Sequence, residues 1–274
     1  MFRKYLDNTR LKTPLVHCIT NYVTVNDCAN ILLACGASPI MADDADEVEE
    51  ITSICNALVI NIGTLNERTV QSMLKAGRKA NELGHPVVLD PVGAGASALR
   101  NSTVFQLLKE VKFAVIRGNI SEIKTAAMGS GTTKGVDADV SDRVTEGNLR
   151  EAVAFAQGLS LRTGAVIVIT GAIDIVADGR RAYVIRNGHA LMSKITGTGC
   201  MLTTVIAAYC AANPEDMTSA AAAAVSAMGL CGELAYEKLQ KENGGTSSYR
   251  TYLIDFMSSM DGELLQGGLK VESR

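Results

Sequence analysis

The sequence has no tryptophan, and aromatic residues make up only 4% of its 274 residues. Large rings therefore cannot fill much of the interior, and we expect a core built from Ala, Val, Ile, Leu and Met. Hydrophobic residues account for 47% of the chain and charged residues for 20%, a balance typical of globular rather than disordered proteins. A chain of this length and composition can bury a sizeable core.

A strong net charge and an apolar leader are also missing. The formal net charge is only -3, so no basic field would attract nucleic acid or an anionic membrane. Residues 1–14 contain no apolar run, so we expect no signal peptide. We also expect no apolar stretch of membrane-spanning length, since the richest one, Ala220–Leu230, is short. The seven cysteines are odd in number and form no C-x-x-C pair, which predicts reduced thiols in a cytoplasmic protein.

Short apolar runs alternate with longer helical patterns along the chain. Several of the runs are almost unbroken series of β-branched residues, which is typical of strands covered on both faces of a parallel sheet. The predicted strands are Leu15–Ile19, Ala57–Ile62, Pro86–Leu89, Phe113–Ile116 and Ala165–Ile169. Helices between such strands indicate right-handed βαβ units and an α/β fold with a mostly parallel central sheet and helices on both faces.

Helical spacing predicts helices over Asn66–Leu83, Thr145–Arg162, Thr198–Ala211, Ser219–Lys241 and Tyr249–Leu265. Asp178-Gly179 lies between two apolar runs and predicts a hairpin, which would add antiparallel strands to the sheet. The polar, glycine-rich segment Gly129–Asp142 is the best candidate for a mobile loop. We find no internal repeat and no long linker, so residues 1–274 are expected to form one domain.

Polar and charged residues follow the predicted strands where each strand ends. Asp90, Arg117 and Thr170 come directly after three of them, Glu122 follows five residues after Arg117, and Gly197-Thr198-Gly199-Cys200 begins a helix. Ligands of open α/β sheets bind at the carboxyl ends of the strands, so we expect these groups on one edge. Two carboxylates for a metal ion, a guanidinium and free helix amides are what phosphoryl transfer needs.

Each of these motifs also has a plain structural explanation. The Gly197–Cys200 segment could be an ordinary turn into a helix, and Glu122 could complete a capping box with Asn119. Asp90 could cap the following loop rather than bind Mg²⁺, and Arg117 could be a surface charge. The residues alone leave these alternatives open; their combination favours a phosphate site.

Together these motifs resemble the ribokinase-like superfamily, in which N-x-x-E is associated with the metal and a G-x-G segment before a helix forms an anion hole. The sequence is most similar to hydroxyethylthiazole kinases. The resemblance rests on four segments and covers most of the chain from Pro14 to the helices after Cys200. These segments are Pro14–Val23 (PLVHCITNYV), Gly36–Ala42 (GASPIMA), Leu89–Gly95 (LDPVGAG) and Arg117–Glu122 (RGNISE).

The resemblance implies ATP-dependent phosphorylation of the hydroxyl of 4-methyl-5-(2-hydroxyethyl)thiazole in thiamine biosynthesis or salvage. It also implies a homotrimer with sites shared between subunits. The expected site residues are Met41, Gly197, Asn21 and Val23 for the thiazole alcohol, Arg117 and Thr170 for ATP, Gly197, Thr198, Gly199 and Cys200 for the anion hole, Asp90 and Glu122 for Mg²⁺, and Cys200 for catalysis.

Cys200 departs from the superfamily pattern, because many members carry Asp at this position. A helix N-terminus can lower a thiol pKa, so Cys200 could act as a base, or it could be a small spacer that positions the alcohol. Three rival functions remain: a kinase for hydroxymethylpyrimidine or pyridoxal, an ADP-dependent nicotinamide-hydrate dehydratase, and a non-catalytic nucleotide-binding module. His17 is expected to be a hydrogen-bonded core residue rather than a catalyst.

Overall fold

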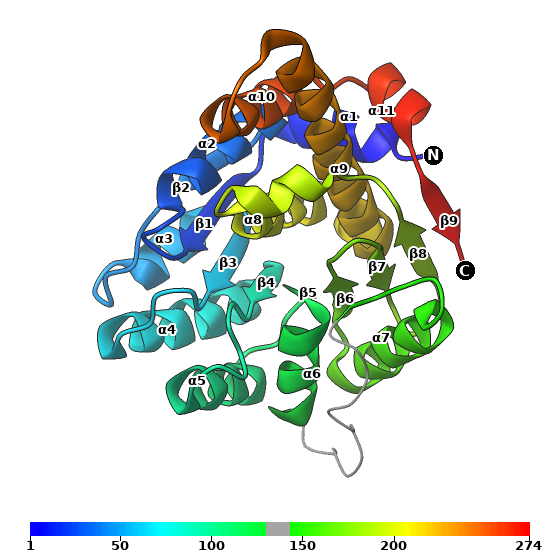
Figure 1. Ribbon diagram of the computed structural model, residues 1–274. Helices are drawn as coiled ribbons and strands as arrows, with labels where there is room; N and C mark the ends of the chain where they lie inside the picture. The colour runs from blue at the N-terminus through cyan, green and yellow to red at the C-terminus, as the bar shows by residue number, and fades with distance from the viewer. Residues whose placement is uncertain (130–142) are drawn as a thin grey trace.

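A twisted sheet crosses the centre of the molecule, with helices on both of its faces (Figure 1). The computed structural model describes residues 1–129 and 143–274. Of the predicted loop Gly129–Asp142, only Gly129 is among them, as the last residue of a helix, and residues 130–142 lie outside the described residues. The rest of the chain gives the α/β architecture that the alternation of apolar runs predicted.

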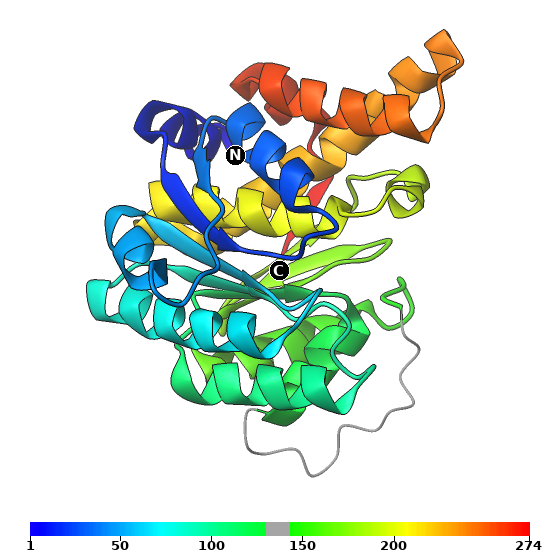
Figure 2. The same ribbon diagram turned by 90° about the vertical axis from the view of Figure 1, so that its left-hand side faces the viewer.

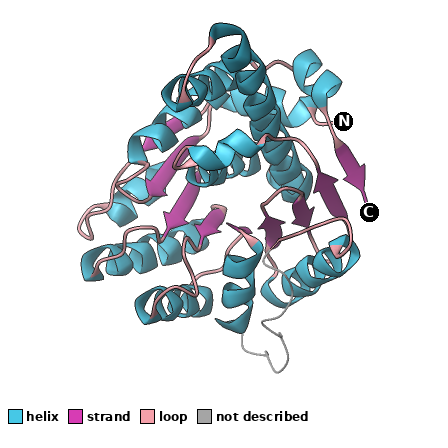
Figure 3. Cartoon of the chain, in the orientation of Figure 1, coloured by secondary structure: helices cyan, strands magenta, loops and turns pink. Residues whose placement is uncertain are grey.

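The sheet of the described residues has nine strands in the order β2-β1-β3-β4-β5-β6-β7-β8-β9. The first six strands in chain order run parallel and the last three are antiparallel (Figure 3). Their bounds are β1 Leu15–Ile19, β2 Ser38–Ile40, β3 Ala57–Asn61, β4 Val87–Asp90, β5 Val115–Gly118, β6 Val166–Ile169, β7 Asp174–Ala177, β8 Ala182–Ile185 and β9 Val271–Ser273.

All five predicted parallel strands are present, each within two residues of its predicted ends, and the predicted hairpin is β7–β8. The sequence pattern missed β2 and β9. Both are three-residue strands at the two edges of the sheet, where half-buried or exposed positions leave no continuous apolar run. A strand that short gives a weak periodic signal.

The helices form two layers (Figures 1 and 2). One layer, with a core of its own against the sheet, contains α1 Arg3–Lys12, α2 Val25–Cys35, α8 Thr198–Ala212, α9 Met217–Glu242, α10 Thr246–Ser259 and α11 Gly262–Gly268. The other layer contains α3 Val48–Ile54, α4 Glu67–Leu83, α5 Ala98–Glu110, α6 Ile120–Gly129 and α7 Leu149–Thr163. Two short 3₁₀ turns, Ala190–Lys194 and Pro214–Asp216, complete the described elements.

Two of the predicted helices end at the expected glycines, and one of them also begins with a capping box. Asn66 and Thr69 form a capping box at the start of α4, and Gly84 ends the helix in the left-handed conformation with φ of 72°. Gly164 ends α7 in the same way, with φ of 74°. Local sequence therefore fixes where these helices begin or end.

The predicted helix Tyr249–Leu265 is wrong, because the structure has two helices there. Helix α10 ends at Ser259, and Met260 adopts an extended conformation with ψ of 123°. Asp261 then caps α11 by accepting hydrogen bonds from the amides of Glu263 and Leu264 at 2.9 and 2.7 Å. A fresh N-cap with its own carboxylate is a strong helix start, and it competes with continuation of the preceding helix.

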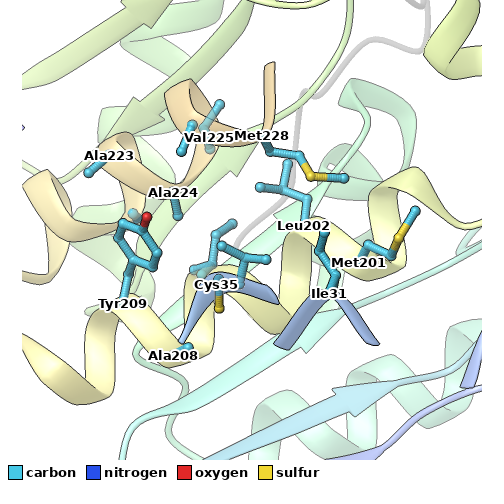
Figure 4. Packing of buried hydrophobic residues seen from close by; sticks show 14 of the residues in the cluster. Ile31, Cys35, Met201, Leu202, Ala208, Tyr209, Ala223, Ala224, Val225 and Met228 are labelled. Atoms are coloured by element: carbon cyan, nitrogen blue, oxygen red, sulfur yellow. The ribbon is translucent and has the colours of Figure 1, made fainter. Parts of the chain in front are cut away.

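Helix α9 corrects a second expectation. Residues Pro214–Glu242 contain a window of 18 residues with mean hydropathy 1.2, so this segment is long and apolar enough to cross a membrane by length and composition. However, 83% of that window is buried inside the molecule. Figure 4 shows why: Ala224 of α9 lies beside Tyr209 of α8, and Met228 lies beside Leu202 of the same helix. Its apolar composition is explained by its place in the core.

Two glycines inside helices offer a matched test of packing. A Cβ on Gly77 of α4 would lie 2.6 Å from Val111 Cγ2, whereas a Cβ on Gly158 of α7 would meet nothing within 4 Å. Gly158→Ala is expected to raise the free energy of unfolding by about 0.5–1 kcal/mol, because alanine favours helices. Gly77→Ala is expected to lower it by about 1–3 kcal/mol, because the added methyl overpacks the core.

Urea unfolding of both variants measures these changes. The additional variant Gly77→Ala/Val111→Ala is expected to recover part of the packing loss, since Val111→Ala removes the colliding Cγ atoms. Equal stabilisation by Gly77→Ala and Gly158→Ala would contradict the close contact with Val111.

Candidate functional site

Five neighbouring strands deliver polar side chains to the carboxyl edge of the sheet. Asn21 lies two residues after β1, Asn61 and Asp90 are the last residues of β3 and β4, Arg117 lies in β5, and Thr170 follows β6. The register pairs Asn61 with Asp90 directly. The first turn of α8 lies over the same edge, since α8 packs on β1, β3 and β4. The structure therefore brings together the predicted residues Asn21, Asp90, Arg117 and Thr170, and adds Asn61 to them.

A buried ion pair forms the centre of this edge. Arg117 Nη1 lies 3.5 Å from Asp90 Oδ1, and Arg117 Nη2 donates to Thr170 Oγ1 at 2.7 Å. The other carboxylate oxygen, Asp90 Oδ2, accepts from Asn61 Nδ2 and Thr203 Oγ1, each at 2.9 Å. Asp90 is fully buried, and these donors offset the cost of keeping a carboxylate out of water.

Cys200 lies between two asparagine side chains. The amides of Asn21 and Asn61 each donate to Cys200 Sγ at 3.3 Å. Their orientations are fixed, because Asn21 Oδ1 accepts from the amide of Thr24 and Asn61 Oδ1 accepts from the amide of Gly63. Asn61 thus contacts both Cys200 and Asp90, and it joins the thiol to the ion pair.

The start of α8 has the geometry of an anion site. Gly197 takes the N-cap position with φ of 91°, and no side chain caps the helix. Among the described residues, the amides of Thr198, Gly199 and Cys200 have no acceptor, and the first backbone bond is from Met201 to Gly197 at 2.8 Å. Free amides and the positive end of the helix dipole favour a bound anion.

Position 199 has to be glycine because the side chain of Arg117 in β5 lies against it. A Cβ at this position would lie 2.5 Å from Arg117 Nη1, so only glycine lets the guanidinium approach the helix start. Arg117 Nε is buried and has no hydrogen-bond partner in the described part of the chain. A spare buried donor beside free helix amides fits a polyanionic ligand such as a triphosphate.

Glu122 forms the predicted capping box. Its amide donates to Asn119 Oδ1 at 2.8 Å, and its Oε2 accepts from the amide of Asn119 at 2.9 Å. Its other oxygen accepts from the amide of Gly93, in the loop after Asp90, at 2.8 Å. Glu122 is thereby tied to the same edge as Asp90, so the two carboxylates do not lie on opposite sides of the molecule.

Burial has the largest effect on the pKa values of Asp90 and Cys200. It raises the pKa of Asp90 to about 6, the Arg117 guanidinium opposes this increase, and the nearby Glu122 carboxylate adds to it. Burial and the charge of Asp90 also raise the pKa of the Cys200 thiol, although the amides of Asn61 and Asn21 lower it in part. Of the two roles left open by the sequence, a raised pKa favours the spacer that positions the alcohol, because desolvation outweighs the effect of the hydrogen-bond donors.

The larger of two cavities lies on the Arg117 side of this edge and has a volume of about 690 Å³. Arg117, Thr170, Thr198 and Gly199 form its polar end. Its remaining wall is mainly apolar and includes residues of α8, α9 and the segment after β8, namely Leu202, Val225, Met228, Asn187, Gly188, His189 and Met192. A cavity of this size with a few converging polar groups can hold a nucleotide.

The smaller cavity, about 200 Å³, lies at the ends of β1–β3 and is lined by Met41, Thr20 and Val25, among others. Of the four residues that the resemblance predicts to contact the thiazole alcohol, only one lines this cavity. Met41 lines this cavity, whereas Val23 is 58% exposed and lies outside its lining. Gly197 and Asn21 are also outside the lining, and Asn21 instead contacts Cys200.

His17 has the predicted structural role. The carbonyl of Ala42 can only accept, so the 2.9 Å contact places the ring proton on Nε2, and Nδ1 accepts from Thr52 Oγ1 at 2.9 Å. Burial lowers its pKa, which keeps the ring neutral. His17 thus fixes the segment that carries Met41.

The sequence pattern missed Asn61, Thr203 and Arg100. Asn61 lies within a predicted apolar strand, and Thr203 lies inside an apolar helix. Arg100 donates to the carbonyls of Ile62 and Gly63, each at 2.8 Å, and so joins the loop after β3 to α5. The side chains that follow each strand could have suggested Asn61; Thr203 could be found only from the tertiary contact with Asp90.

Asp90 and Glu122 can supply only part of the ligands that a magnesium ion needs. The described residues contain no group of three or more His, Cys, Asp or Glu that could hold a metal ion. Mg²⁺ is commonly held by one or two carboxylates with water and substrate phosphates, so Asp90 and Glu122 do not need a third protein ligand. Asp90 Oδ2 already accepts two hydrogen bonds. Asp90 Oδ1 and the two Glu122 oxygens each have one protein donor and so retain a further lone pair.

Comparison with known proteins agrees with this geometry. Residues 6–263 match the model of the hydroxyethylthiazole kinase family. The chain is 63% identical over 273 residues to a hydroxyethylthiazole kinase from Clostridium acetobutylicum, with 100% of each chain covered.

Solved structures place the chain in the same group. A hydroxyethylthiazole kinase protein from Pyrococcus horikoshii matches with a TM-score of 0.87 and 35% identity, over 100% of this chain and 98% of that one. A ribokinase-like superfamily protein from Enterococcus faecalis matches with a TM-score of 0.60 at 14% identity, over 94% of this chain and 90% of that one, and shares the fold. The fold is ribokinase-like, and the chain belongs to the hydroxyethylthiazole kinase family.

Proposed function

We propose that this chain transfers the γ-phosphoryl group of ATP to the hydroxyl of 4-methyl-5-(2-hydroxyethyl)thiazole, a step of thiamine biosynthesis or salvage. Family membership supports the reaction. The observation that carries the mechanism is the row of contacts from Asn21 through Cys200, Asn61 and Asp90 to Arg117. This row lies between the smaller cavity and the polar end of the larger one, where a phosphoryl group would have to pass.

ATP occupies the larger cavity with its phosphates at the polar end. Arg117 Nε and the free amides of Thr198, Gly199 and Cys200 are donors for the phosphate oxygens. Thr170 holds the guanidinium through its hydroxyl and lines the same cavity. These donors are in place before the reaction, which is how fixed dipoles stabilise charge that develops in a transition state.

The thiazole alcohol occupies the smaller cavity against Met41, with its hydroxyl directed to the start of α8 and Gly197. Its oxygen attacks the γ-phosphorus in line while the bond to the β-phosphate oxygen breaks and ADP leaves. The hydroxyl proton passes to an oxygen of the transferred phosphoryl group and from there to solvent. Cys200 is the group that meets the alcohol. Its raised pKa keeps it a thiol at neutral pH, so positioning the alcohol outweighs proton removal.

Magnesium would be held by Glu122 and Asp90, and when bound it would neutralise charge on the ATP phosphates. Asp90 also keeps Arg117 directed at the helix start through their ion pair.

We further propose a cytoplasmic homotrimer in which a neighbouring subunit completes the thiazole site. Tyr22 lines the smaller cavity yet is 79% exposed, and Val23 beside it is 58% exposed. Exposed apolar side chains at the mouth of a substrate cavity are suited to being covered by another subunit. The mass of the protein in solution tests this assembly.

An ATP-coupled assay with thiazole alcohol, hydroxymethylpyrimidine and pyridoxal side by side tests the proposed function. We expect turnover with thiazole alcohol and little with the other two. Faster turnover of hydroxymethylpyrimidine or pyridoxal would favour the rival vitamin kinases. ADP-dependent loss of water from nicotinamide hydrates, measured in the same series, would instead indicate the dehydratase.

Gly199→Ala tests the contact between the helix start and Arg117. The added methyl would displace the guanidinium, and misplacement by about 1 Å is expected to lower kcat/KM for ATP on the order of 100-fold. Gly171→Ala in the same cavity is the control, because the atom nearest to its added Cβ is the Ile173 carbonyl oxygen at 3.8 Å. A similar loss in both variants would show that Arg117 is not the cause.

Cys200 variants separate positioning from base catalysis. Cys200→Asp is expected to stay active, because many superfamily members carry Asp at this position. Cys200→Ala is expected to lose part of kcat, but less than the roughly 100-fold or greater loss that follows removal of a general base. Wild-type kcat in Cys200→Ala would rule out the base role, and a loss of several thousandfold would rule out a purely positioning role.

A further inference from the structure

His189 lines the larger cavity on the wall away from its phosphate end, and no step of the proposed reaction uses it. Its imidazole stacks on Tyr236 of α9, with ring centroids 3.6 Å apart and an angle of 18° between the ring planes. Tyr236 is not part of the cavity lining, so it supports the ring from behind. The opposite face and an edge of the imidazole are therefore what His189 presents to the cavity.

The orientation of the ring is fixed by a second contact. His189 Nδ1 accepts a hydrogen bond from the amide of Leu191 at 3.2 Å. The proton of the neutral ring is therefore on Nε2. A stack on one side and a backbone bond in the ring plane leave the imidazole little freedom to rotate.

Residues 187–192, which carry His189, pack against one face of α9. Gly229, Gly232, Glu233 and Tyr236 are three, four and seven residues apart and so share one helix face. A Cβ on Gly229 would lie 2.7 Å from the carbonyl oxygen of Asn187, so only glycine lets the strand end approach the helix this closely.

The same face of α9 holds residues 187–192 through hydrogen bonds to Glu233 and through close packing at Gly232. Glu233 Oε1 accepts from the amide of Gly188 at 2.8 Å and from Asn187 Nδ2 at 3.2 Å. A Cβ on Gly232 would lie 2.4 Å from Met192 Sδ, so the segment is in close contact with α9 beyond His189 as well. Residues 187–192 are thus held in place from several directions.

This face of the helix continues toward the phosphate end as the apolar wall of the cavity. Val225 and Met228 lie on the same face of α9, and Figure 4 shows Met228 beside Leu202 of α8. A triphosphate bound at the start of α8 would place the rest of the nucleotide along this wall. The wall offers apolar side chains and one flat, fixed ring, and flat rings are favourable partners for a planar base.

We propose that His189, supported by Tyr236, is the platform on which the adenine base of ATP stacks. This inference rests on the proposed function, because it assumes ATP in the larger cavity. His189 acts through its ring face, and Glu233 and Tyr236 are positioning residues that act through it.

Direct binding experiments separate the base from the phosphates. We would measure dissociation constants of ATP and of inorganic tripolyphosphate by calorimetry for the full chain and its variants. Tripolyphosphate probes only the phosphate end of the cavity. His189→Ala is expected to weaken ATP binding about three- to tenfold, the size of one lost aromatic stack, and to leave tripolyphosphate binding unchanged.

Two further variants define the interaction. His189→Phe keeps a flat ring and is expected to restore ATP binding, whereas His189→Asn keeps a polar donor without a ring and is expected not to. His85→Ala is the matched control, because His85 lies just before β4, at the opposite end of the strands from the site. Steady-state kinetics should show the same change in KM for ATP, with KM for the thiazole alcohol and kcat unaltered.

Each result tests whether the base stacks on His189. Equal weakening of ATP and tripolyphosphate in His189→Ala would mean that the segment was disrupted, and unchanged ATP binding would mean that the base lies elsewhere; either overturns the inference. Rescue by His189→Asn instead of His189→Phe would replace stacking by a hydrogen bond and would also overturn it. Wild-type protein that binds no ATP would instead refute the proposed function, so the two failures can be told apart.

Discussion

The buried pair of Asp90 and Arg117 is the interaction on which the site depends. A carboxylate without solvent contact is costly unless it is paired and hydrogen-bonded, and Asp90 has three protein donors. These donors come from β3, β5 and α8, while Asp90 itself ends β4. The pair therefore ties three strands and the helix above them together at the point where a phosphoryl group would be transferred.

The same pair explains why small and polar residues surround it. Arg117 can lie beneath the first turn of α8 only because Gly199 has no side chain. Asn61 connects Asp90 to Cys200, and Asn21 holds the thiol from the other side. Burial and the Asp90 charge keep the thiol protonated, so the carboxylate that pairs with Arg117 also leaves little Cys200 thiolate to accept a proton. In the proposed reaction, charge stabilisation and precise placement therefore contribute more than proton transfer to Cys200.

Two helices of the same layer serve different ends of the larger cavity. Helix α8 supplies free amides at the phosphate end, whereas α9 supplies an apolar wall and a seat for the segment after β8. Both helices are apolar on nearly every side because they pack between the sheet and the outer helices (Figures 1 and 2). This burial explains how α9 can be apolar enough for a membrane and still be a core helix.

The sequence by itself determined five of the six parallel strands, the approximate bounds of four helices and the identity of several residues at the strand ends. Unbroken β-branched runs, glycine caps and the Asn119–Glu122 box are local signals, and each acts within a few residues of chain. Motif resemblance then indicated the family and the roles of Arg117, Thr170 and Gly197–Cys200.

Only the tertiary structure decided which of these residues interact. Asn61, Thr203 and Arg100 gain their importance from contacts with segments far away in the chain, and the pKa of Cys200 depends on burial that no local pattern encodes. The stack of His189 on Tyr236 joins residues from two elements whose sequences give no sign of each other. Local chemistry fixes elements, but distances between elements depend on packing of the whole core, and the function of the site depends on those distances.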